Sequence, residues 1–216
     1  MNYLSHGYRF VDDPYFVAGT ALPDWMSVLD RRNRARSQAA SALTESPDLE
    51  LAAMARGVMQ HHEDDRWFHQ SESFARLSTS FAVELRGLLT EGHQAGFLGH
   101  IAVELLLDAV LIEDVPERLE AYYNALSQLD PRVVQDAANR LLPRPVERLS
   151  LLVPRFIEER FLADYADNQL LWRRLNHVMR RVGLEPLPTP IIDWLESARQ
   201  RVRDSADSLL INNSSP

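Results

Sequence analysis

Histidine and carboxylate side chains recur four positions apart in two segments of the chain. In the first segment, His61, Asp65 and His69 follow one another at this interval. On an α-helix such positions lie about 40° apart around the axis, so the three side chains line one narrow stripe. Imidazole nitrogens and carboxylate oxygens arranged in this way bind one divalent cation or two neighbouring ones. We therefore interpret the segment as metal-binding.

A second stripe with the same spacing contains His100, Glu104 and Asp108. The residues between these positions are apolar, which predicts a helix that is buried over most of its surface. Burying an ionisable group is costly unless the group is paired or bound to metal, so these three residues are also candidate ligands. The alternative is a helix that presents the three side chains to water as its polar face.

Two further candidate ligands, His6 and Asp24, stand alone near the start of the chain. Their spacing alone fits a packed or surface histidine and a carboxylate at a helix N-terminus, where the helix dipole favours negative charge. Six of the seven histidines lie at or before position 100. This uneven distribution indicates that the chemistry belongs to the first half of the chain.

The composition narrows the possible classes of site and partner. The chain has no cysteine and no lysine, so any metal must be bound through nitrogen and oxygen, and all 23 basic residues are arginine. The net charge of −8 argues against broad binding to nucleic acid or to an anionic membrane. Arg31, Arg32 and Arg34 form the densest basic cluster. They are weak candidates for contacting a substrate phosphate, and the alternative is a solvated helix end.

Apolar residues recur at spacings of three and four, and β-branched runs are few, which predicts an all-α fold. We expect a single-domain helical bundle over residues 1–210, with the metal site in 1–113, an unmatched helical half in 114–210 and a frayed tail at 211–216. The chain start has no apolar signal-peptide core, and no apolar run reaches the roughly 18 residues of a membrane helix. A cytoplasmic protein without membrane insertion is the expectation. The expected helices span 22–33, 47–78, 79–91, 94–112, 115–128, 131–141, 144–163, 164–182 and 189–207.

The set His6, Asp24, His61, Asp65 and His100 resembles the metal-binding residues of the acyl carrier protein phosphodiesterase family. The opening Met-Asn-Tyr-Leu-Ser-His is similar to the start of its members, and Gly19 and Gly57 match glycines of its motifs. The resemblance covers about the first half of the chain. It implies an all-helical, HD-type metal phosphohydrolase that removes the phosphopantetheine arm from acyl carrier protein with a divalent cation such as manganese.

The chain departs from that family at one position. The family has Asp directly before the later histidine, whereas this chain has Gly99 before His100. The pair His100 and Glu104, the Leu-Pro-Asp segment at Asp24 and the Phe68-His69 pair look more like the zinc-dependent phospholipase C group. That second resemblance also implies an all-helical enzyme that cleaves phosphoester bonds with a metal cluster.

These observations predict a metal-dependent phosphoester hydrolase with one or two cations. Acyl carrier protein and a lipid or nucleotide phosphodiester are alternative substrates, and manganese, zinc and iron (Mn, Zn or Fe) all suit the ligands. Asp65 and Glu104 are the candidate catalytic bases. The rival hypothesis is a helical metal-binding or scaffold protein of the same fold that lacks catalysis. The predicted ligands are His6, Asp24, His61, Asp65, His69, His100 and Glu104.

Overall fold

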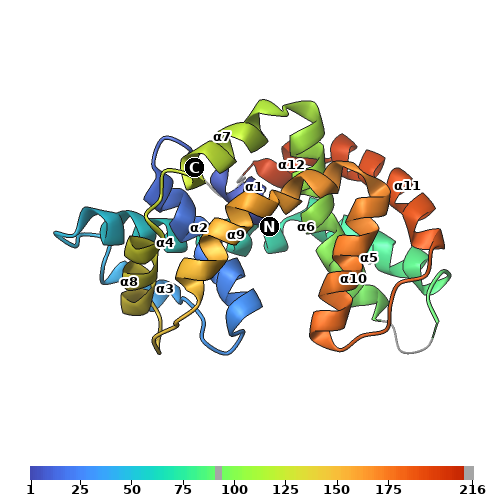
Figure 1. Cartoon of the computed structure of the whole chain (residues 1–216). Coiled ribbons are helices and arrows are strands. Elements are labelled where there is room, and N and C mark those ends of the chain that lie inside the picture. The colour runs from blue at the N-terminus through green and yellow to red at the C-terminus, as the bar shows by residue number, and fades with distance from the viewer. Residues whose placement is uncertain (91–93, 212–216) are drawn as a thin grey trace. The chain divides into compact units, whose positions relative to one another are not determined.

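The computed structural model describes residues 1–90 and 94–211. It is 75% helical, and no strand occurs in the described ranges, so the predicted all-α class is confirmed (Figure 1). Residues 91–93, which include His93, and residues 212–216 lie outside the described ranges. The helices are α1 (Tyr3–Gly7), α2 (Pro14–Leu29), α3 (Ser37–Ser41), α4 (Leu49–Gln70), α5 (Glu72–Arg86), α6 (Ala95–Asp114), α7 (Glu117–Leu126), α8 (Pro131–Leu141), α9 (Leu149–Glu159), α10 (Asn168–Val182), α11 (Pro190–Asp204) and α12 (Ala206–Leu210), with a 3₁₀ helix, η1 (Phe161–Ala166).

The packing of the chain forms two compact units. Unit 1 contains Met1, Trp67–Val115 and the described residues of Leu162–Pro216, and unit 2 contains Asn2–Arg66 and Pro116–Phe161. Each unit therefore combines stretches that are far apart in the sequence. The prediction of one domain over residues 1–210 stays a prediction.

Unit 2 contains a close crossing of α2 and α4 at two glycines. A Cβ atom on Gly19 would lie 2.3 Å from the carbonyl oxygen of Met54, and one on Gly57 would lie 2.2 Å from that of Phe16. The distance between packed helices depends on the side chains at the contact, so two glycines allow the backbones to approach closely. This approach positions His61, one turn after Gly57, against the backbone of α2.

The start of α2 differs from the sequence-based expectation. The helix begins at Pro14, where Asp13 Oδ1 accepts a hydrogen bond of 3.0 Å from the Phe16 amide. An acidic N-cap followed by proline is a strong helix start, because proline has no N–H group to leave unsatisfied. Pro23, the second residue of the helix expected over 22–33, instead lies well inside α2. The predicted start at residue 22 was wrong, because Asp13 and Pro14 already start the helix at residue 14.

The long helix expected over 47–78 is two helices. α4 ends at Gln70, and Ser71 caps α5 by accepting a hydrogen bond of 3.2 Å from the Phe74 amide to its hydroxyl oxygen. Serine is a favoured N-cap residue because its side chain satisfies an amide that has no partner within the helix. By contrast, the helix predicted over 131–141 is confirmed as α8, with Asp130 accepting from the Arg132 amide at 2.8 Å.

Unit 1 is built around α6, which packs against α5 and α11. A Cβ atom on Gly99 would lie 2.8 Å from the Ser78 carbonyl oxygen and 2.9 Å from the Ala82 amide nitrogen of α5. This crossing leaves no room for a side chain at position 99. Across the other contact, Arg199 of α11 is buried and donates to Glu113 at 2.7 Å and to the Tyr165 carbonyl oxygen at 2.8 Å.

The length and composition of α6 also satisfy the criteria for a membrane span. An 18-residue window of this helix has a mean hydropathy of 1.9, so the expectation that no apolar run reaches this length was wrong. However, 67% of the apolar window is buried inside the protein, as in the core helix of a globular protein. Its apolar character therefore has an explanation in the packing of unit 1.

Candidate metal centres

His6, His61 and Asp65 come together in unit 2 and form what we call the first triad. His6 Nε2 lies 3.4 Å from Asp65 Oδ1, and His61 Nε2 lies 3.4 Å from Asp65 Oδ2. One ligand atom from each residue lies within 4.8 Å of the other two. Ligand atoms that are about 2.1 Å from a tetrahedral cation lie about 3.4 Å from one another. The triad therefore has dimensions that suit a divalent metal ion.

Both imidazoles of the first triad are oriented through their other ring nitrogen. His6 Nδ1 lies 3.1 Å from Asp64 Oδ2, and His61 Nδ1 lies 2.9 Å from the Thr20 carbonyl oxygen. A carbonyl or carboxylate oxygen can only accept, so each Nδ1 carries the proton, and Nε2 is the lone-pair nitrogen of the neutral ring. Metal-binding histidines usually have this arrangement. Here it directs both Nε2 atoms toward the same carboxylate.

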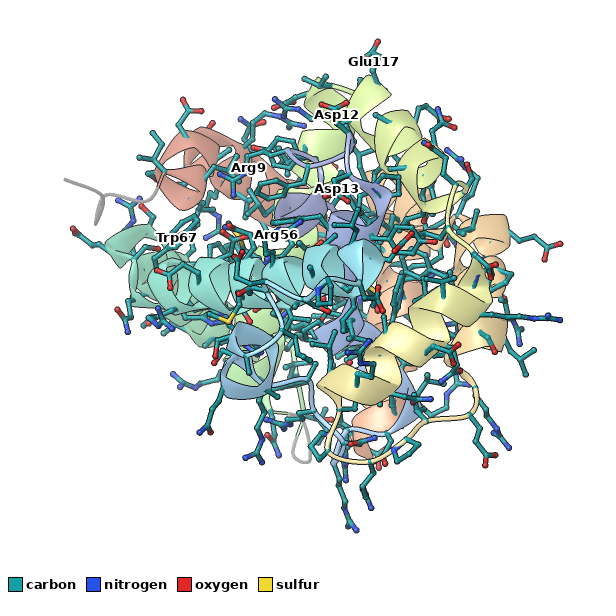
Figure 2. The ribbon with its side chains drawn as sticks, turned by 90° about the vertical axis from the view of Figure 1, so that its left-hand side faces the viewer. Arg9, Asp12, Asp13, Arg56, Trp67 and Glu117 are labelled. Carbon is teal, nitrogen blue, oxygen red and sulfur yellow. The ribbon has the colours of Figure 1, made fainter. Side chains whose placement is uncertain are left out.

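Asp64 is a functional residue that the sequence reasoning missed. Its side chain is 1% exposed and accepts from Gln60 at 2.8 Å as well as from His6. Arg9 lies beside α4, where its guanidinium is 3.4 Å from Asp64 Oδ1 (Figure 2). Asp64 directly precedes the predicted ligand Asp65, but no spacing rule links it to a histidine 58 positions earlier in the chain. Only the tertiary structure identifies it as the residue that orients His6.

The Asp65 carboxylate is ionised in this setting. Burial raises the pKa of Asp65, but the His6 and His61 imidazoles, when their Nε2 atoms carry protons, outweigh burial and hold that pKa well below its ordinary value. A carboxylate that remains ionised is available as a metal ligand or as a proton acceptor. With 30% of its side chain exposed, Asp65 is the member of the first triad that water reaches most easily.

His69, His100 and Glu104 come together in unit 1 and form the second triad. His69 Nε2 and His100 Nε2 lie 2.8 Å and 3.2 Å from the same oxygen, Glu104 Oε1. The Met1 amino group lies 3.4 Å from this oxygen. Burial raises the pKa of Glu104, but the amino group and the two imidazoles outweigh it and hold the pKa well below its ordinary value.

The predicted stripe of His61, Asp65 and His69 is thus divided between the two triads. Eight residues of α-helix rise by about 12 Å, so imidazoles at positions 61 and 69 are too far apart for one cation. Neighbouring pairs stay together, because four residues rise by only about 6 Å. The spacing allowed one shared cation or two neighbouring ones. The structure favours two separate groups of candidate ligands.

The predicted ligand Asp24 and the further candidate Asp108 belong to neither triad. Asp24 lies on α2, and that helix contributes to the first triad through the Thr20 backbone carbonyl instead. Asp108 is completely buried on α6, so the alternative of a water-facing polar stripe is wrong at that position. His62 makes a structural contact, because its Nε2 donates to the Ala35 carbonyl oxygen at 2.8 Å. Burial lowers the pKa of His62.

The arginine cluster lies in the turn that follows α2. Arg31, Arg32 and Arg34 are all exposed. Arg34 Nε donates to the Arg31 carbonyl oxygen at 3.2 Å, and the Arg32 amide donates to Asp30 Oδ1 at 3.1 Å. These contacts shape the turn, and a role in phosphate binding stays a prediction.

The glycines that carry part of the family resemblance have their own packing roles. Gly19 and Gly57 form the crossing of α2 with α4, and Gly99 lies in the crossing of α5 with α6. The family's Asp could not occupy position 99 without moving α5. No family model matches this chain, and no curated protein or solved structure matches it. The geometry of the two triads therefore carries the functional argument.

Proposed function

We propose that this protein is a metal-dependent phosphoester hydrolase whose catalytic cation is held by His6, His61 and Asp65. One observation supports this proposal above all others. Two imidazole Nε2 atoms and a carboxylate converge, and each ring is oriented through its Nδ1 by a separate acceptor, Asp64 or the Thr20 carbonyl oxygen. Three acceptors that face one another repel unless a cation or a proton lies between them.

Three protein ligands leave coordination positions for water and for a substrate oxygen. A bound divalent cation lowers the pKa of its water toward neutrality and polarises a phosphoryl oxygen. In this setting Asp65 is the candidate for taking up the proton, since its carboxylate is the most exposed member of the first triad. Glu104 belongs to the other unit's triad, and its predicted catalytic role is not included in this proposal.

Arg9 is the basic residue that geometry connects to the first triad. Its guanidinium contacts Asp64 at 3.4 Å while 41% of the side chain remains exposed. An arginine held in this way can form a two-pronged contact with a phosphate and cannot lose its charge. We propose that Arg9, rather than the cluster at Arg31, binds the substrate phosphate.

The proposed substrate class is a phosphodiester of a small molecule or carrier. The phosphopantetheine arm of acyl carrier protein remains one candidate through the resemblance. The net charge of −8 argues against nucleic acid. A cytoplasmic location is part of the proposal.

The test is hydrolysis of bis-p-nitrophenyl phosphate by protein loaded with manganese or zinc. The His61→Ala variant should lose at least about 100-fold in kcat/KM, because the cation that activates water is lost. His177→Ala is the matched control, since His177 is exposed on α10 and belongs to neither triad. Equal activity in wild type and His61→Ala, with both folded by circular dichroism, would refute the proposal.

A binding or scaffold protein is the second candidate. The near-complete burial of His6 and His61 favours it, because a buried site can hold a cation tightly without admitting a substrate. Tight metal binding without turnover of holo acyl carrier protein or of the generic phosphodiester would support this second candidate.

A further inference from the structure

We propose that unit 1 carries a second, exchangeable divalent-cation site, formed by His69, His100 and Glu104, which links the end of α4 to α6. This inference does not depend on the function proposed for the first triad. It concerns a different set of ligands, and its test counts bound cations rather than turnover.

The second triad has the donor set and the dimensions of a metal site. Both imidazole Nε2 atoms contact Glu104 Oε1, at 2.8 Å and 3.2 Å, and one ligand atom from each residue lies within 4.8 Å of the other two. Cis ligands of a cation with bonds of about 2.1 Å lie roughly 3.0 to 3.4 Å apart. Small rotations of these side chains would therefore place three donors around one ion.

Local structure brings the three ligands together. His100 and Glu104 are four residues apart on α6, so both side chains project from one face of that helix. His69 lies in the last turn of α4. A cation bound by all three would thus connect α4 with α6. His69 and His100 are 31 positions apart in the chain.

An aromatic side chain supports both rings of the second triad. The Phe74 ring lies edge-on to His69 and to His100, with centroid distances of 4.9 Å and 4.8 Å. The two imidazole centroids are themselves 4.8 Å apart. Phe74 is buried at the start of α5, so packing of this residue limits the positions that the imidazoles can take.

Exposure distinguishes the second triad from the first. The side chains of His69 and His100 are 32% and 45% exposed, whereas those of His6 and His61 are 0% and 5% exposed. His100 also lines an open pocket of about 240 Å³ with Ser78, Thr79 and Arg86. Water and a chelator can therefore reach the second triad directly. We expect its cation to exchange faster than the cation of the first triad.

The experiment is a Mn²⁺ titration of the full-length protein, with free metal measured by electron paramagnetic resonance. Wild type and the His177→Ala control should each bind two ions per chain. His100→Ala and Glu104→Gln should each bind one, and so should His61→Ala, which retains the second triad. A stopped-flow chelator chase on wild type should show two release phases, and the faster phase should be missing from His100→Ala.

Two outcomes would overturn the inference. One is a wild-type protein that binds a single ion and a His61→Ala variant that binds none. The other is binding of two ions by both His100→Ala and Glu104→Gln. If the protein does not hydrolyse the phosphodiester, this result counts against the proposed function only. The number of bound Mn²⁺ ions still decides whether the second site exists. Because Glu104→Gln keeps the size of the side chain, it gives a result even if His100→Ala folds poorly.

Discussion

Replacing Asp64 with Asn should weaken metal binding at the first triad without removing a ligand. Asp64 accepts the Nδ1 proton of His6 and is 1% exposed, so solvent screens this charge very little. The amide of Asn keeps a hydrogen-bond acceptor of similar size but has no charge. His6 then becomes a weaker donor of electrons to a cation, and its preferred tautomer is less firmly set.

The expected loss of affinity is about 10- to 100-fold, or about 1.4 to 2.8 kcal/mol. We expect the upper half of this range, because a charge-assisted hydrogen bond is roughly twice as strong as a neutral one and this bond is buried. His6 contacts Oδ2 of Asp64, whereas Gln60 and Arg9 contact Oδ1, so the single amide oxygen of Asn can serve only one of these two sets.

Metal affinity is measured by competition with a chromophoric chelator for zinc or manganese. Glu63→Gln is the matched control, because it removes the same charge from the adjacent position of α4, where the side chain is exposed and pairs with Arg66. This control should bind metal within about twofold of wild type. An Asp64→Asn variant with wild-type affinity, or equal weakening in both variants, would refute the role of Asp64 in orienting His6.

Three further predictions concern packing and pH. Gly57→Ala should destabilise unit 2 by at least about 1 to 3 kcal/mol in denaturant unfolding and reduce metal binding, since its Cβ would lie 2.2 Å from the Phe16 carbonyl oxygen. Gly99→Asp, which restores the residue of the resembling family, should lower the free energy of unfolding by a similar amount and not raise activity, because a Cβ there meets the backbone of α5. Arg201 lowers the pKa of Glu84 from 4.5 to about 2, so this pair stabilises unit 1 fully above pH 4.5 and is lost as pH falls toward 2. Glu84→Gln should therefore reduce the drop in the free energy of unfolding between pH 5 and pH 2, by an amount below about 1 kcal/mol because the carboxylate is partly exposed. An unchanged drop would contradict this assignment.

The sequence was sufficient to predict structure that depends on a single helix. The all-α class follows from the apolar spacing, and α8 follows from Asp130 and Pro131. The pairing of His61 with Asp65 and of His100 with Glu104 also follows, because residues four apart share a helix face in any tertiary context. The same reasoning does not extend to residues eight apart. The rise of the helix separates His61 from His69, so the two imidazoles do not share one group of ligands.

The tertiary structure alone decided which distant residues complete each triad. A glycine pair brings α2 and α4 into close contact, so that Thr20 orients the His61 imidazole, and His6 lies on α1, which packs against α2. The contact of Asp64 with His6, like the absence of Asp24 from both triads, depends on helix packing that no spacing encodes. The sequence by itself determined the ligand types and the pairs on each helix, because these depend on backbone periodicity. The partners across helices depend on close packing, which is a property of the folded chain.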